Sequence, residues 1–264
     1  PSAVPLRIMG TDSGAESQRR ASGAAPARAL AIIPAWNEEA ALPGTLAELH
    51  AMRPDLDVLV VSDGSTDHTA DIARAAGATV AELAFNLGIG GALQTGFRYA
   101  VRHGYERAVQ FDADGQHDPR EIATLFHALD AGADMVVGTR FGDGGTVEYR
   151  VGPMRRGAMS VLRFMMNTMT HNNFSDTSSG FRAFDRPVLE MFSNTYPVEF
   201  MDSTESLLHV CNAGMRAIEV PTVIRERQAG TPSTRHFRLV FHYTRLLVTM
   251  LSQWTFRRPA DAGS

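Results

Sequence analysis

Short apolar runs alternate with segments of helical periodicity from about residue 30 to residue 138, and this alternation limits the fold of the 264-residue chain more than any other feature. The apolar runs are expected to be strands, with helices of roughly 10 to 15 residues between them. The expected strands are Leu30–Ile33, Asp57–Val61, Thr79–Leu83, Arg107–Phe111 and Asp134–Gly138, and the expected helices are Asn37–Met52, Asp67–Ala76, Gly91–Arg102 and Pro119–Ala131. Strands that alternate with helices of this length imply right-handed βαβ units. The pattern therefore predicts an α/β fold with a mostly parallel sheet flanked by helices.

The pattern is less regular after Arg140, where a glycine-rich, charged loop is expected over residues 142–149. Further helices are expected near residues 154–170, 203–213 and 237–255, with a strand at 217–220. The helix at 154–170 carries a methionine-rich stripe, and the terminal helix is amphipathic with basic residues at both ends. For both helices, packing against the core is the main interpretation and contact with a lipid surface is the alternative. The sequence thus predicts a flexible tail (1–28), one domain (29–235) and a C-terminal amphipathic helix with a tail (236–264).

Composition excludes several classes of protein. A formal net charge of −4 argues against a nucleic-acid binder, which would show a concentrated basic face. The single cysteine, Cys211, excludes an intramolecular disulfide framework and suits a reducing compartment. No apolar run approaches the roughly 20 residues that span a bilayer, and the start of the chain does not resemble a secretory signal. We therefore expect a cytoplasmic protein, with peripheral attachment to the inner face of the cell membrane as a variant of that location.

The stretch from Phe111 to Pro119 places two acids and an amide directly after an expected strand. Ligands of open α/β sheets collect where strands end. The side chains of Asp112, Asp114 and Gln116 can offer oxygen atoms to a hard cation, which in turn neutralises phosphates. The stretch predicts a site for a metal-bound diphosphate, and the alternative is an acidic loop that caps the helix starting near Pro119.

Six short motifs occur in order along the chain. They are Ile33–Glu39 (IPAWNEE), Val61–Asp67 (VSDGSTD), Asn86–Gly88 (NLG), Asp112–His117 (DADGQH), Gly138–Phe141 (GTRF) and Asp176–Arg182 (DTSSGFR). Together they resemble a family 2 glycosyltransferase, and especially the branch of the dolichol-phosphate mannose synthases and polyprenyl-phosphate sugar transferases, over about residues 30–235. The resemblance implies a GT-A fold, a UDP- or GDP-linked sugar donor, a divalent metal ion and inversion at the anomeric carbon.

The resemblance assigns roles to residues on the donor side. It makes Asp114 and Gln116 ligands of Mg²⁺ or Mn²⁺, with Asp114 also counted as a catalytic residue. Two alternatives stay open: Asn37 caps the following helix, and Arg227 is a solvated surface charge. Ser62 and Ile89 replace an acid and a lysine that many relatives carry, so no cationic donor contact is expected at Ile89. The expected donor-binding residues are Pro34, Ala35, Asn37, Glu38, Asp63, Asp112 and Arg227.

The acceptor decides the chemistry of the other side. A hydroxyl acceptor must lose a proton to a positioned base, whereas a lipid phosphate is already ionised and needs cations. Arg140, Arg155 and Arg156 fall where related lipid-phosphate transferases hold such a phosphate, and Arg140 is counted as catalytic. Asp176 is counted as catalytic, either as the base for a hydroxyl acceptor or as an organiser of the acceptor side, and the alternative is a turn residue. Arg155, Arg156 and Arg182 are the expected acceptor-binding residues.

The sequence therefore predicts an inverting, metal-dependent transferase that moves a sugar from a nucleotide donor to polyprenyl phosphate. One alternative keeps the fold and uses a glycan or another hydroxyl as the acceptor. The other is a nucleotide-binding protein without transferase activity. The sequence leaves open the sugar, the base of the donor and whether the chain forms a homo-oligomer.

Overall fold

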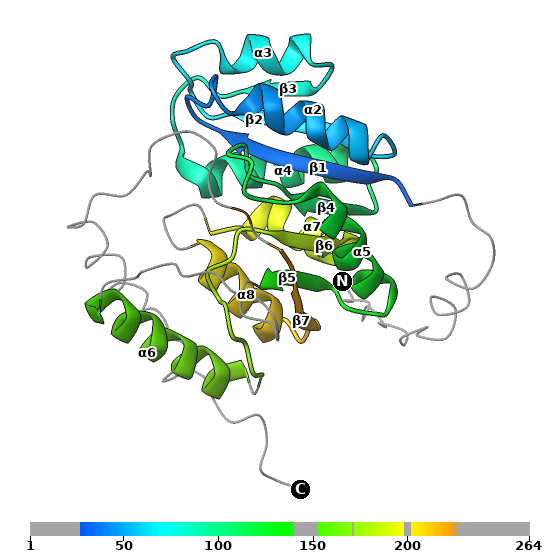
Figure 1. The fold of residues 1–264 in the computed structure, drawn as a ribbon. Coiled ribbons are helices and arrows are strands. Elements are labelled where there is room, and N and C mark those ends of the chain that lie inside the picture. Colours follow the sequence, from blue (N-terminus) through cyan, green and yellow to red (C-terminus); the bar gives the residue numbers. More distant parts are fainter. Residues whose placement is uncertain (1–26, 140–152, 171, 198–201, 224, 226–264) are drawn as a thin grey trace, which may run out of the picture.

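The apolar runs form the strands of one seven-stranded sheet in the computed structural model, which describes residues 27–139, 153–170, 172–197, 202–223 and 225 (Figure 1). The strand order is β3-β2-β1-β4-β6-β5-β7. The strands are β1 (Ala29–Ala35), β2 (Asp57–Ser62), β3 (Thr79–Glu82), β4 (Arg107–Gln110), β5 (Met135–Thr139), β6 (Arg182–Asp185) and β7 (Ala217–Pro221). The helices are α2 (Leu42–Met52), α3 (Thr69–Ala75), α4 (Gly88–Arg102), η1 (Pro119–Glu121), α5 (Ile122–Asp130), α6 (Pro153–Thr170), α7 (Arg186–Thr195) and α8 (Asp202–Asn212).

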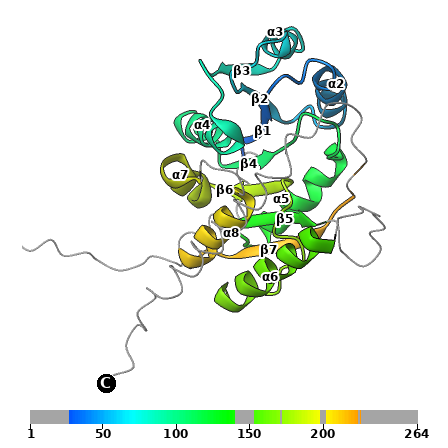
Figure 2. The ribbon, with the colours of Figure 1, turned by 90° about the vertical axis from the view of Figure 1, so that its left-hand side faces the viewer.

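Helices cover both faces of the sheet, which explains the unbroken apolar runs of its central strands. In β1, Leu30 and Ile32 belong to the core on the side of α4, α7 and α8, whereas Ala31 and Ile33 belong to the core on the side of α2 and α5. All four side chains are fully or almost fully buried. Figure 2 shows the layers, with α4 and α7 on one side of the sheet and α2 and α5 on the other. The predicted α/β fold with a mostly parallel sheet is confirmed.

One strand runs against the others. Strand β6 is antiparallel to both neighbours, and Ala183 pairs with Val109 of β4 on one side and Val136 of β5 on the other. The sequence analysis did not predict β6 or α7, because β6 is only four residues long and begins with an arginine. Since β6 is antiparallel, the segment that precedes it lies at the same edge as the carboxyl ends of β4 and β5.

The first helix is shorter than predicted. The chain was expected to become helical at Asn37, but α2 begins at Leu42, with Pro43 in its first turn. Asn37 has φ 54°, in the left-handed region, which breaks a right-handed helix. The alternative in which Asn37 caps this helix is wrong, because the residue before its first turn is Ala41.

Several predicted segments lie outside the described residues, namely the tail before residue 27, the loop at 142–149 and the helix at 237–255. Within the described part, no helix combines the length and apolar character that crossing a membrane requires.

Helix α4 approaches β1 through a glycine, and this contact yields a stability prediction. A β-carbon on Gly96 would lie 2.4 Å from Cγ2 of the buried Ile32. We expect Gly96→Ala to lower the free energy of unfolding by about 1 to 3 kcal/mol, because the packed core must shift. Gly44→Ala is the control, since Gly44 is exposed in α2 and its added β-carbon would meet nothing within 4 Å. It should raise that free energy by about 0.5 to 1 kcal/mol. Urea unfolding followed by circular dichroism measures both, and equal effects would contradict the packing argument.

Candidate active site

The loops that follow β1, β2 and β4 meet at one edge of the sheet. The amide of Asp63, just after β2, donates to the carbonyl oxygen of Ala35 at 2.8 Å, and the amide of Phe111, just after β4, donates to that of Ile32 at 3.0 Å. After β1 the chain continues to β2 and β3 on one side of β1, and it then returns to form β4 on the other side. The gap between β1 and β4 is therefore a switch point of the sheet. Such points are where open α/β sheets bind ligands.

Asn37 joins the loop after β1 to the loop after β2. Its amide donates to Oγ of Ser65 at 3.2 Å, and its side-chain Oδ1 accepts from the amide of Thr66 at 2.8 Å. The next amide, that of Glu38, donates to Oγ1 of Thr69 at 2.9 Å. Of the predicted donor-binding residues, Pro34 and Ala35 end β1, and Asn37 and Glu38 stand in the loop that follows, which these hydrogen bonds fix. Their contact with a donor stays a prediction.

Asp63 is buried and organises the start of α4. Its carboxylate accepts hydrogen bonds from the amides of Leu87 and Gly88, at 2.7 and 2.8 Å. Burial raises the pKa of Asp63, and the two amide hydrogen bonds lower it by less. The carboxylate thus holds the loop after β3 against the end of β2. The predicted contact between Asp63 and the nucleoside is untested.

The acidic loop after β4 is held from two directions. Oγ1 of Thr45 in α2 donates to the carbonyl oxygen of Ala113 at 2.8 Å. Asp114 is 3% exposed, and its Oδ1 accepts from the amide of Gln116 at 3.0 Å. The residue that caps the following helix η1 is Asp118, whose Oδ1 accepts from the amide of Arg120. The helix-cap alternative therefore applies to Asp118 and not to Asp112 or Asp114.

His117 fixes the orientation of Asp112 and was missed by the sequence analysis. Its Nδ1 accepts from the amide of Asp112 at 3.0 Å, so the proton of the neutral ring sits on Nε2. This Nε2 lies 3.5 Å from Oδ2 of Asp112. The imidazole stacks on the ring of Phe181, with centroids 4.5 Å apart. The motif Asp112–His117 contained the signal, since it places an imidazole within reach of its own acids.

The turn before β6 lies against the acidic loop. A β-carbon on Gly180 would lie 3.2 Å from Oδ2 of Asp112 and 3.3 Å from Nε2 of Gln110. The motif Asp176–Arg182 therefore meets the motif Asp112–His117 at this position. The absence of a side chain at Gly180 leaves room for the carboxylate of Asp112.

The donor atoms of the acidic loop fit a divalent cation. Asp112 and Asp114 offer carboxylate oxygens and Gln116 an amide oxygen, which are the ligands that Mg²⁺ and Mn²⁺ prefer. Among the described residues, no three His, Cys, Asp or Glu side chains gather as a metal site. Such a loop suits an ion that takes its other ligands from phosphates and water, as Mg²⁺ commonly does.

Arg182 lies in the interior, whereas the sequence analysis expected it to contact the acceptor. It is 1% exposed, and its guanidinium donates to Oε1 of Gln110 at 2.6 Å, to the hydroxyl of Tyr196 at 3.0 Å and to Oγ of Ser206 at 2.7 Å. Its place in β6 explains the burial, because this strand lies between β4 and β5. Arg182 thus connects β4 with α8 and with the residue that follows α7. Its burial argues against direct contact with an acceptor.

Asp176 shapes the turn before β6. It is 2% exposed, and its Oδ1 accepts from the amide and the hydroxyl of Ser178, at 3.2 and 2.9 Å. Glu219 of β7, which the sequence analysis missed, accepts from the amides of Asp176 and Ser175 at 2.7 Å. These bonds match the turn interpretation of Asp176, and its role as a base stays untested.

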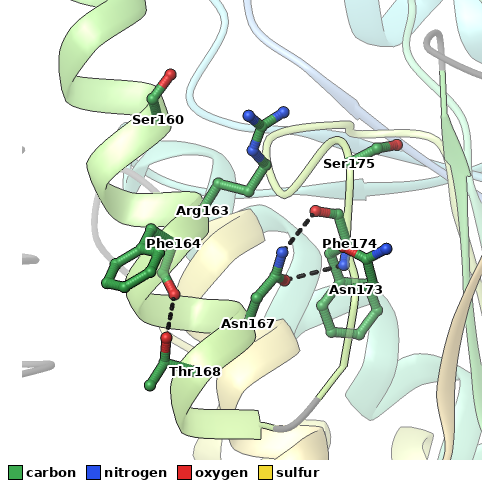
Figure 3. Close-up of a pocket in the computed structure, with 8 residues that line it drawn as sticks. All are labelled: Ser160, Arg163, Phe164, Asn167, Thr168, Asn173, Phe174 and Ser175. Carbon is green, nitrogen blue, oxygen red and sulfur yellow. Dashed lines mark hydrogen bonds between the residues drawn. The ribbon is translucent and has the colours of Figure 1, made fainter.

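A groove of about 580 Å³ separates α6 from the loop before Asp176 (Figure 3). Two hydrogen bonds join Asn167 of α6 to the backbone of Phe174, at 2.9 and 3.1 Å. Ser175 lies 3.1 Å from Oγ1 of Thr139, which connects the groove with the end of β5. Figure 3 shows Phe164 pointing away from this loop. The lining residues are Ser160, Arg163, Phe164, Asn167, Thr168, Asn173, Phe174 and Ser175.

Four predicted arginines cannot be placed against this groove. Arg140 and Arg227 lie outside the described residues. Arg155 and Arg156 belong to α6, but the description of this helix does not extend to their side chains.

Comparisons with known proteins identify relatives of the chain. Residues 30–192 match the family described as Glycosyl transferase family 2. The polyprenol monophosphomannose synthase of Mycolicibacterium smegmatis is 35% identical, over 77% of this chain and 79% of the relative. The undecaprenyl-phosphate mannosyltransferase of Micrococcus luteus is 34% identical, over 77% and 86%.

Solved structures are similar in fold. The glucosyl-3-phosphoglycerate synthase of Mycobacterium tuberculosis, crystallised with Mn²⁺, UDP-glucose and phosphoglyceric acid, has a TM-score of 0.66 and 21% identity, over 99% of this chain and 90% of that chain. The mannosyltransferase PcManGT of Pyrobaculum calidifontis, in complex with GDP-mannose and Mn²⁺, has a TM-score of 0.60 and 22% identity, over 93% and 71%. The predicted GT-A fold is confirmed.

Proposed function

The chain belongs to glycosyltransferase family 2, in the branch of the dolichol-phosphate mannose synthases, and from this premise we propose that it transfers a sugar from a UDP- or GDP-linked donor to polyprenyl phosphate. In this proposal the transfer requires Mg²⁺ or Mn²⁺ and inverts the anomeric carbon in a single displacement. The observation that carries it is the pair Asp112 and Asp114, which stand at the switch point of the sheet and are not used to cap a helix.

On the donor side, the residues act by positioning charge. Asp114 and Gln116 would hold a divalent cation, which would supply counter-charge for the departing nucleoside diphosphate. Asp114 is held in place by the amide of Gln116, and Asp112 by His117. The fixed loop after β1, with Asn37 at its tip, would bind the nucleoside. Because these groups are already hydrogen-bonded, little reorganisation is needed when the donor binds.

On the acceptor side, the groove beside α6 suits an anionic group. Its lining combines the exposed Arg163 with polar residues such as Asn173 and Ser175. Arg140, Arg155 and Arg156 are proposed to hold the phosphate, which is ionised and needs no base. The catalytic domain would span residues 29–235 and work at the cytoplasmic face of the membrane.

A panel of UDP- and GDP-linked sugars tests this function. With polyprenyl phosphate present, we expect one or a few donors to yield a lipid-linked sugar, detected by mass spectrometry. A chelator should abolish the product, and added Mg²⁺ or Mn²⁺ should restore it, because the diphosphate leaves poorly without a cation. Transfer to a glycan but not to the lipid would favour the hydroxyl alternative. A complete lack of transfer with every donor would favour a nucleotide-binding protein.

A further inference from the structure

Arg225, four residues after the end of β7, connects three parts of the molecule that are distant in sequence. Its Nη1 donates to both carboxylate oxygens of Glu48 in α2, each at 2.8 Å. Its Nη2 lies 2.8 Å from Oδ2 of Asp118, at the end of the acidic loop. The side chain of Arg225 is 24% exposed and that of Asp118 is 6% exposed. Such a partly buried guanidinium between two carboxylates is better fixed than an exposed ion pair.

The backbone of Arg225 forms two hydrogen bonds with Gln116. Its amide donates to the carbonyl oxygen of Gln116 at 2.8 Å, and its carbonyl oxygen accepts from Nε2 of Gln116 at 3.4 Å. The second bond orients the side-chain amide of Gln116, because only the nitrogen can donate to a carbonyl. The oxygen Oε1 is then the atom of this amide that is left to bind a cation.

We propose that Arg225 is a positioning residue that holds Gln116 in place for a divalent cation, with its own side chain anchored by Glu48 and Asp118. This inference rests on the metal dependence in the proposed function and is independent of the acceptor.

Asp118 connects Arg225 with helix η1. Its Oδ1 caps η1 while its Oδ2 holds Arg225, so one carboxylate fixes both structures.

Helix α2 supports the acidic loop at both ends. Thr45 holds the carbonyl of Ala113, and Glu48, three residues later on the same face of the helix, holds Arg225. Asp112 and Asp114 lie near the first of these supports, and Gln116 near the second. A loosened Arg225 should therefore affect Gln116 more than the two acids.

The test compares Arg225→Ala with Arg120→Ala. Arg120 is the control because its side chain also donates hydrogen bonds to Asp118 but is 69% exposed. Mn²⁺ binding is measured by electron paramagnetic resonance in the presence of UDP or GDP, without acceptor. We expect Arg225→Ala to raise the half-saturating Mn²⁺ concentration by roughly 10- to 100-fold, as the loss of a residue supporting a metal ligand does. Arg120→Ala should change it by less than about threefold.

Two further variants keep the inference testable if Arg225→Ala does not fold. Glu48→Gln and Arg225→Lys each retain part of the contact and should raise the half-saturating Mn²⁺ concentration by an intermediate factor, about 3- to 10-fold. In turnover assays, saturating Mn²⁺ should restore most of kcat for these variants. Equal Mn²⁺ affinity in folded Arg225 and Arg120 variants overturns the inference.

Failure of this inference is distinct from failure of the proposed function. If the wild-type protein binds Mn²⁺ with a nucleoside diphosphate but transfers no sugar, the proposed function is wrong and the comparison of variants still decides the role of Arg225. If the wild-type protein binds no Mn²⁺ with either nucleotide, this inference is overturned.

Discussion

Asp114→Asn is expected to lower sugar transfer by roughly 10²- to 10⁴-fold, the largest effect that we predict for a single substitution. Asparagine can still accept the hydrogen bond from the amide of Gln116, so the turn after β4 is kept while the charge is lost. A neutral oxygen binds Mg²⁺ or Mn²⁺ more weakly than a carboxylate, and the departing diphosphate then lacks its counter-charge. Initial rates at saturating donor, over a range of Mn²⁺ concentrations, measure the effect.

The control for this substitution is Asp130→Asn, which removes an equal charge from an exposed side chain at the end of α5. It should leave transfer within about twofold of the wild-type rate. Circular dichroism and the melting temperature check that both variants fold. If folded Asp114→Asn retained the wild-type rate and metal dependence, the acidic loop could not be the metal site.

The double variant Arg155→Ala with Arg156→Ala should lower kcat/KM for polyprenyl phosphate by roughly 10²- to 10³-fold. Charge-assisted hydrogen bonds to a phosphate contribute about 1.5 to 3 kcal/mol each. Because the lipid phosphate is already ionised, a base elsewhere in the site cannot make up for the loss of the two arginines. Affinity for the nucleotide donor should change by less than about threefold, because these arginines are assigned to the acceptor. Steady-state kinetics with varied lipid and varied donor separate the two effects.

A matched control removes two arginines from exposed positions on other helices, Arg74 in α3 and Arg102 in α4. The Arg74→Ala, Arg102→Ala variant should keep both kinetic parameters near the wild-type values. Equal loss in the two double variants would point to net charge rather than a phosphate site. An unchanged kcat/KM for the lipid in a folded Arg155, Arg156 variant would contradict the assignment of these arginines to the acceptor phosphate.

Much of the fold followed from the sequence because its central strands are buried on both faces. In runs such as Val58–Val61 every side chain is apolar and buried, and the spacing of these runs with helices indicates parallel strands. The four residues of β6 gave no such signal. Arg182 begins this strand, and a buried arginine is recognisable only from its partners Gln110, Tyr196 and Ser206, which lie far away in the chain.

The candidate site was predictable where one segment supplies its chemistry. The acids of the loop after β4 are neighbours in sequence, so their convergence needs no tertiary information. The contacts of Arg225 with Glu48, and of Glu219 with Ser175, join distant segments, and a single sequence does not show them. His117 lies between these cases, because its ring acts on a residue five positions earlier.

The antiparallel strand β6 also affects the order in which the sheet can be completed during synthesis. Strands β3, β2, β1 and β4 pair with one another using residues up to 110, whereas β5 meets β4 only through β6. Until Arg182–Asp185 leave the ribosome, β4 and β5 each lack a neighbour, and their open edges can pair with other chains. The N-terminal four-stranded half can therefore form first, and the half with β5 and β7 has to wait for a strand made more than forty residues after β5.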